Sequence, residues 1–154
     1  MDAFAAMNIS VAVDVSMTVS ADYLANMVEY CLGDATTTYG ALRIADGHPA
    51  VYKPYAFEIG NEQYNPNFVE QVTAMEAKAH ALGYNPSPWF YMFPDNDGMN
   101  AADQAKAVAA GLNIRKIATD VHVGSAGAIE SITALFNKSP SFGASAINGE
   151  VNAM

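Results

Sequence analysis

The chain has 154 residues, a formal net charge of −9 and 51% hydrophobic residues. A single domain of this length buries roughly 68 to 70% of the surface that its unfolded chain exposes, so a hydrophobic core is expected. The seven Lys and Arg residues are few for a protein that neutralises phosphates. The composition therefore argues against a nucleic-acid partner and favours a neutral ligand.

The sequence contains one cysteine, Cys31, which can form no internal disulfide, so nothing in it requires an oxidising compartment. It contains no run of 18 apolar residues and no basic segment followed by an apolar one. We therefore expect no membrane span, no membrane partner and no signal peptide within these residues.

The first third of the chain predicts one βα unit followed by a long connection. Residues 8–15 are rich in β-branched side chains and predict a strand. Ser20 can cap a helix, and Gly33 is placed to end that helix in a left-handed conformation. Residues 34–54 are predicted to be irregular, and loops of this length are usually functional or disordered.

Strands and helices continue to alternate after that connection. The helix that begins at Asn65, with Pro66 at its first helical position, has the clearest apolar repeat, and Gly83 should end it. The other predicted elements are a strand at 55–59, an aromatic strand at 89–93, a helix at 101–110 between Asn100 and Gly111, a strand at 114–123, a helix after Ser125 and a strand at 143–147.

Five strands alternating with four helices predict an α/β fold with a parallel sheet. Two architectures fit this pattern. One is an open, flavodoxin-like sheet, which suits the length of the chain. The other is part of a (βα)₈ barrel, which typically needs about 250 residues. The first strand is not followed by a Gly-rich loop that could bind phosphate. The sequence therefore does not support the phosphate-containing ligand that an open sheet usually binds.

In both architectures, functional side chains gather where the strands end. Glu62 follows the second predicted strand and Glu150 the fifth. A carboxylate buried at such a strand end is costly unless it has a compensating role. Two carboxylates converging there, about 5 to 5.5 Å apart, would suit retaining glycoside hydrolysis.

Three short motifs carry a resemblance to a known family. Residues 58–62 read Glu-Ile-Gly-Asn-Glu behind an aromatic residue, and Gly-Asp-Ala-Thr at 33–36 and Ala-Asp-Gly-His-Pro at 45–49 precede them. Together they resemble the central part of the α-L-arabinofuranosidases, retaining glycoside hydrolases built on (βα)₈ barrels. Residues 148–153, Asn-Gly-Glu-Val-Asn-Ala, are similar to the Gly-Glu end of that family's seventh strand.

The resemblance implies a role for each candidate site residue. Glu62 is expected to be the acid/base at the end of the fourth barrel strand, Asn61 to bind the sugar, and Glu150 to be the nucleophile. His122 lies in an Asp-x-His segment similar to one in the family and either binds substrate or satisfies a neighbouring carboxylate. The tyrosine that steadies the nucleophile in the family has no counterpart after His122, where Val123 and Gly124 stand.

The resemblance also implies what the chain does and which part of the barrel it forms. Residues 1–154 would be one segment of a catalytic barrel, covering about the third to seventh strands. The expected reaction is hydrolysis of terminal α-L-arabinofuranosyl residues from arabinose-containing oligo- or polysaccharides, without metal or cofactor. This substrate class favours a secreted location. A non-catalytic, sugar-binding remnant remains the alternative, and the oligomeric state is open.

Several other residues are predicted to be structural. His48 in Gly-His-Pro is expected to order its loop, and Glu58 to be buried or hydrogen-bonded within the strand. Trp89, Tyr91 and Phe93 are expected to lie in the core rather than to stack on sugar, because aromatic strands usually do so.

Overall fold

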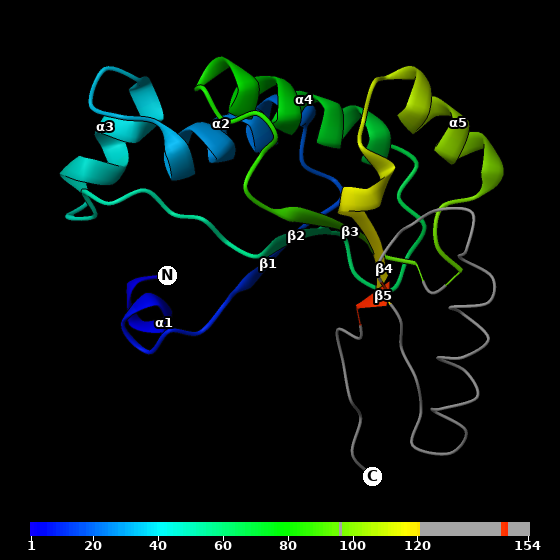
Figure 1. Ribbon diagram of the computed structural model, residues 1–154, viewed down its shortest axis with the longest axis horizontal. Helices are drawn as coiled ribbons and strands as arrows, with labels where there is room; N and C mark the ends of the chain where they lie inside the picture. The colour runs from blue at the N-terminus through cyan, green and yellow to red at the C-terminus, as the bar shows by residue number, and fades with distance from the viewer. Residues whose placement is uncertain (96, 121–145, 148–154) are drawn as a thin grey trace, which may run out of the picture.

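The computed structural model describes residues 1–95, 97–120 and 146–147, in which strands alternate with helices (Figure 1). The helices are α1 Asp2–Ala6, α2 Ala21–Leu32, α3 Thr38–Ala45, α4 Phe68–Ala81, α5 Ala101–Ala109 and the short 3₁₀ helix η1 Ile114–Lys116. The strands are β1 Ala12–Val15, β2 Ala56–Ile59, β3 Phe90–Phe93, β4 Ile117–Asp120 and β5 Ala146–Ile147.

The five strands form one parallel sheet in the order β1-β2-β3-β4-β5, so each strand pairs with the next one along the chain. The predicted parallel α/β fold is confirmed. A flavodoxin-like sheet has the order 2-1-3-4-5, so the sequential order contradicts that alternative. Sequential pairing is the order within a (βα)₈ barrel, whose closure needs eight strands.

The two faces of the sheet differ in what covers them. Along each strand the side chains alternate between the faces. Phe57 and Tyr91 are paired in register and pack in the main core with residues of α2, α4 and α5, which lie on one side of the sheet in Figure 1. The opposite face carries a smaller cluster of Ala56, Met92 and Ala118.

The aromatic residues around β3 belong to the main core, as predicted. Trp89, Tyr91 and Phe93 are each at most 1% exposed. The Trp89 ring stands edge-on to Phe57 at 4.9 Å, and its indole N–H donates to the Tyr91 hydroxyl at 2.8 Å. These rings therefore stabilise the layer between sheet and helices and do not line a sugar site.

The helix α2 begins as predicted, since the Ser20 side chain accepts from the backbone N–H of Tyr23 at 3.1 Å. The helix also ends at Gly33 as predicted, but the predicted left-handed conformation was wrong, because Gly33 is extended, with φ −65° and ψ 154°. A Cβ on Gly33 would lie 2.2 Å from Thr37 Oγ1 and 2.6 Å from the carbonyl oxygen of Glu29. Glycine is needed there for close packing rather than for a left-handed turn.

The prediction of an irregular segment at 34–54 was also wrong, since α3 lies inside it. Thr37 caps α3 by accepting from the N–H of Gly40 at 3.2 Å. The buried side chain of Arg43 then donates to four carbonyl oxygens outside the helix, those of Tyr30, Cys31, His48 and Pro49. The carbonyl oxygen of His48 accepts from Arg43 Nε at 3.0 Å, so the backbone of this loop is ordered, whereas a role for the His48 side chain stays a prediction.

The two other predicted helices within the described residues are confirmed, one of them with a shifted start. Asn67 rather than Asn65 precedes the first residue of α4, so Pro66 lies outside the helix. Gly83 follows α4 with φ 88°, as a helix stop requires. Asn100 caps α5 by accepting from Ala102 and Asp103. None of the helices in the described ranges is long and apolar enough to cross a membrane. The helix predicted after Ser125 lies outside the described residues.

Candidate active site

The C-terminal ends of β1 and β2 lie side by side and border an open pocket of about 350 Å³. The backbone N–H of Gly60 donates to the carbonyl of Val15 at 2.8 Å, which extends the pairing of the two strands to their ends. The pocket is lined mainly by the loops that follow the strands, with Asp14, Ser16, Met17, Thr18, Gly60, Asn61 and Gln63. The predicted sugar-binding residue Asn61 therefore belongs to a polar pocket at the strand ends.

Gly60 makes the sharp exit from β2 possible. Its φ is 115°, a conformation that residues with a Cβ rarely adopt. A Cβ here would also lie 2.9 Å from Pro94 Cγ and 3.2 Å from Met17 Cβ. The loop can therefore pass close to the ends of both neighbouring strands before it reaches Asn61.

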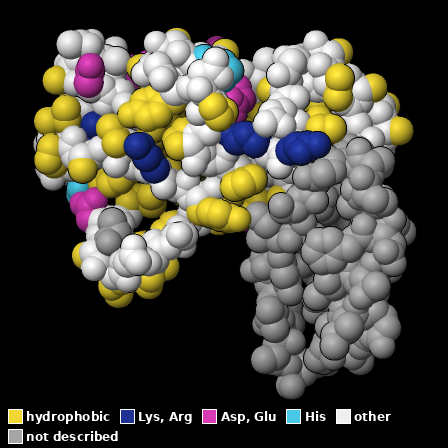
Figure 2. Space-filling view, viewed as in Figure 1, with side chains coloured by type: hydrophobic (Ala, Val, Ile, Leu, Met, Phe, Trp, Pro, Cys, Tyr) yellow, Lys and Arg dark blue, Asp and Glu magenta, His cyan; other side chains and the backbone are white. Residues whose placement is uncertain are grey.

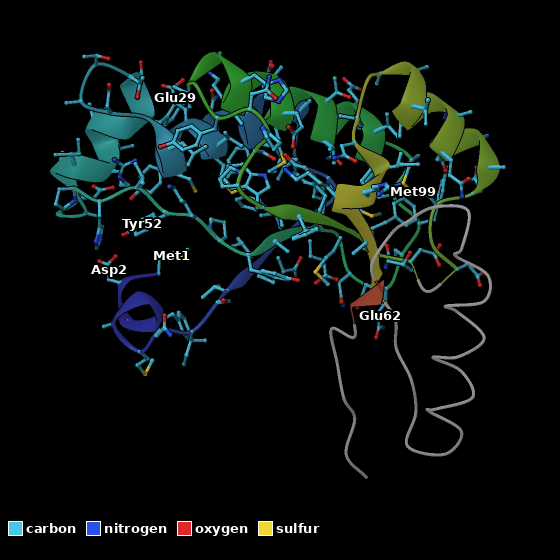
Figure 3. The ribbon with its side chains drawn as sticks, in the orientation of Figure 1. Met1, Asp2, Glu29, Tyr52, Glu62 and Met99 are labelled. Atoms are coloured by element: carbon cyan, nitrogen blue, oxygen red, sulfur yellow. The ribbon has the colours of Figure 1, made fainter. Side chains whose placement is uncertain are left out.

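Glu62 is exposed, which contradicts the expectation that its charge is buried. Its φ is 51°, so a residue other than glycine occupies the left-handed region. This conformation costs on the order of 1 kcal/mol, and such strain clusters at functional sites. Figure 3 shows Glu62 beyond the sheet on the side away from α2 and α4. The backbone thus turns this carboxylate outward at the strand ends.

Two other predicted site residues, His122 and Glu150, lie outside the described residues. The distance between Glu62 and Glu150 is therefore untested, and both assignments stay predictions. Glu58 is half-buried and shares a face of the sheet with its register partner Asp14. It projects from within β2, whereas Glu62 lies in the loop that follows the strand.

A buried pair of amides holds the two strand ends together. Asn65 Nδ2 donates to the carbonyl of Ile59 at 2.9 Å and to Gln71 Oε1 at 2.8 Å. Gln71 Nε2 donates in turn to the carbonyls of Met17 and Val19, at 3.0 and 2.8 Å. Both amides are 1% exposed. The chain of hydrogen bonds connects the loop after β2, through α4, to the loop after β1.

Tyr64 fastens the other side of the same loop. Its hydroxyl donates to Asp103 Oδ2 at 2.8 Å, and Asn100 Nδ2 donates to the same oxygen at 2.6 Å. The hydrogen bond to Asp103, with some burial, raises the pKa of Tyr64 above its usual value. The ring of Tyr64 also stands edge-on to Phe93 at 5.9 Å. The segment with Asn61 and Glu62 is therefore anchored to α4 on one side and to α5 on the other.

The sequence analysis missed the anchoring residues and most of the pocket lining. Gln71 had a visible signal, because it lies on the buried face of α4 with Phe68, Val72 and Met75. A polar residue on such a face predicts a buried hydrogen bond. Asp14 and Gln63 had no comparable signal. Within the described ranges, no group of three or more His, Cys, Asp or Glu residues is placed to hold a metal ion.

Comparison with known proteins indicates the family to which the chain belongs. The profile of the Alpha-L-arabinofuranosidase 1 domain family matches residues 2–125. Two curated proteins named probable alpha-L-arabinofuranosidase A, from Aspergillus oryzae and Aspergillus flavus, are each 33% identical over 95 residues. Each alignment covers 59% of this chain but only 14% of the relative. On the family match, this chain belongs to the Alpha-L-arabinofuranosidase 1 domain family.

Proposed function

We propose that the strand ends of this chain form part of a retaining α-L-arabinofuranosidase site that removes terminal arabinofuranosyl residues from arabinose-containing polysaccharides. The observation that carries the proposal is the polar pocket at the ends of β1 and β2, which Asn61 lines and Glu62 adjoins. Family membership supplies the reaction class. In this proposal, residues 1–154 are one segment of a (βα)₈ barrel.

Glu62 and Glu150 carry the two chemical steps of the proposal. Glu62 first protonates the glycosidic oxygen while the Glu150 carboxylate attacks the anomeric carbon, so the bond to the leaving alcohol breaks as the glycosyl ester forms. Glu62, now a carboxylate, then takes a proton from water, which displaces Glu150 and frees the sugar. Asn61, at the pocket wall, orients the sugar beside the bond that breaks.

The proposal requires a curved sheet. β2 and β5 are three strand positions apart in the sheet order, a separation of about 14 Å if the sheet were flat. Retaining hydrolysis needs the two carboxyl groups about 5 to 5.5 Å apart. The strand ends must therefore tilt toward a common axis, as the strands of a (βα)₈ barrel do.

The test is hydrolysis of a chromogenic α-L-arabinofuranoside, measured in the 154-residue chain and in a longer parent protein if one exists. Glu62→Gln and Glu150→Gln should each lower turnover by at least about a thousandfold with little change in thermal stability. Glu70→Gln, at an exposed position in α4, is the matched control and should leave turnover unchanged. Turnover that survives in either active-site variant would contradict the assignment.

A second candidate is sugar binding without turnover. The exposure of Glu62 favours it, because catalytic groups act most effectively in a site from which water is excluded. A binding segment should retain affinity for arabinose-containing oligosaccharides, lost in Asn61→Ala, while it releases no arabinose. Measuring binding and release on the same sample distinguishes the two candidates.

A further inference from the structure

A second pocket lies away from the strand ends, on the outer surface of α2 and α3. Its volume is about 290 Å³. Five residues line it, Tyr23, Asn26, Met27, Tyr30 and Tyr39, and none of them carries a charge. We call this the tyrosine pocket. Figure 2 shows hydrophobic side chains gathered over this part of the molecule.

The tyrosine pocket is held in place by the fold. The residues from α2 recur at helical spacing beside the buried face of Leu24 and Val28, and Met27 packs against the main core. The hydroxyl of Tyr30 donates to Asp46 Oδ2 at 3.0 Å. The backbone N–H of Tyr39 donates to Glu29 Oε1 at 3.1 Å, which fixes the start of α3 against α2. The Tyr30 side chain and the backbone of Tyr39 are thus held in position by contacts within the protein.

The polar groups of the pocket make few hydrogen bonds within the described part of the chain. Tyr23 is 59% exposed, whereas Asn26 and Tyr39 are half-buried. Within the described residues, the hydroxyls of Tyr23 and Tyr39 and the side-chain amide of Asn26 make no hydrogen bond. Tyrosine rings can stack on an apolar face, and their hydroxyls and the Asn26 amide can form hydrogen bonds. These groups therefore suit a ligand that has both apolar faces and many hydroxyl groups.

We propose that the tyrosine pocket is a second binding site for a neutral saccharide, separate from the strand ends, and that it holds the polysaccharide on which the chain acts. The choice of an arabinose-containing polymer rests on the proposed function. The aromatic rings stack on the sugar faces while Asn26 and the free hydroxyls bond to sugar hydroxyls.

Charge and polarity favour a saccharide over other occupants. A chain with a net charge of −9 repels polyanions, and the pocket supplies no cation to bind them. A purely apolar protein surface would bury the tyrosine hydroxyls and the Asn26 amide without partners, at a cost of about 1 to 3 kcal/mol for each group. A sugar satisfies these groups and covers the rings together.

The test is affinity electrophoresis and calorimetry of the 154-residue chain with soluble arabinoxylan and with linear arabinan. Tyr23→Ala should weaken binding about three- to tenfold, and Asn26→Ala should weaken it as well. Both positions lie on the surface of α2, where alanine is the best helix former, so the fold should persist, as circular dichroism can confirm. Val108→Ala, at a position in α5 that is also 59% exposed, should bind like the unchanged chain.

The outcomes separate this inference from the proposed function. Loss of binding in Tyr23→Ala, with hydrolysis of a small chromogenic arabinofuranoside unaltered, supports the second site. If the unchanged chain hydrolyses nothing but still shows binding that depends on Tyr23, the proposed function fails while this inference stands. Equal binding by Tyr23→Ala and the unchanged chain overturns the inference of a second saccharide site. An absence of binding to both polymers overturns it as well. A lower molar mass of Tyr23→Ala in light scattering would overturn it in favour of a second copy as the occupant.

Discussion

The side-chain amide of Asn65 donates to that of Gln71 across 2.8 Å, and both groups are almost completely buried. This pair links the loop after β2 to the loop after β1, which it reaches through the carbonyls of Met17 and Val19. The position of Asn61 and Glu62 therefore depends on two residues that cannot themselves touch a ligand.

Gln71→Ala should destabilise the protein by roughly 2 kcal/mol or more, because it removes the donor to two loop carbonyls and the acceptor for Asn65. Urea denaturation measures the change as a lower midpoint with an unchanged slope. Glu70→Ala is the matched control, since Glu and Gln have similar helix propensities and Glu70 is exposed. Equal destabilisation by both variants would show that the amide pair contributes nothing specific.

The sequence was sufficient for those parts of the fold that depend on neighbouring residues. Ser20, Asn100 and Gly83 act on their own helix ends through local backbone geometry, so their roles were predicted correctly. The parallel orientation of the strands followed from the alternation of strands and helices, because parallel strands need long crossover connections.

The failures have a different cause, which is packing and turn geometry that the propensities of single residues do not reveal. The helix α3 contains Thr, Tyr and Gly, which are poor helix formers, and is stabilised by Arg43 reaching the carbonyls of α2. Gly33 is required by the nearby Thr37, not by its own backbone angles. The exposure of Glu62 follows from the turn at Gly60, which a count of strand residues does not reveal.

Tyr64→Phe should loosen the loop that carries Asn61 and Glu62, because it removes the hydrogen bond to Asp103 and keeps the ring. We expect a loss of stability of roughly 1 to 2 kcal/mol and faster amide hydrogen exchange at residues 61–64. Tyr55→Phe is the control, since Tyr55 is 47% exposed and its hydroxyl makes no described hydrogen bond. Unaltered exchange in the loop would contradict an anchoring role for Tyr64.

Arg43→Lys should destabilise the protein by roughly 2 to 4 kcal/mol although it keeps the charge. The planar guanidinium reaches four carbonyl oxygens in different directions, and a lysine ammonium cannot reproduce that geometry. Thermal denaturation measures the effect. Arg115→Lys, at an exposed position in η1, should change the melting temperature little. Similar melting temperatures for the two variants would argue against a structural role of the Arg43 fork.

Glu29→Gln should lower stability at pH 7 by roughly 1 kcal/mol or more, because Glu29 Oε2 accepts from Lys78 at 2.6 Å and Oε1 accepts from the N–H of Tyr39. The Lys78 hydrogen bond, helped by that of Tyr39, lowers the pKa of Glu29 below 4.5 in the folded protein. A carboxyl group whose pKa is lowered by folding contributes its stability above the unfolded pKa and loses it as the pH falls through the folded pKa. The difference in unfolding free energy between the unchanged chain and Glu29→Gln should therefore be constant near pH 7 and shrink below about pH 4.5.

Urea denaturation from pH 7 to pH 3 measures this difference, with Glu70→Gln as the exposed control in α4. A difference that grows in acid would mean that the ion pair between α2 and α4 is not what stabilises them.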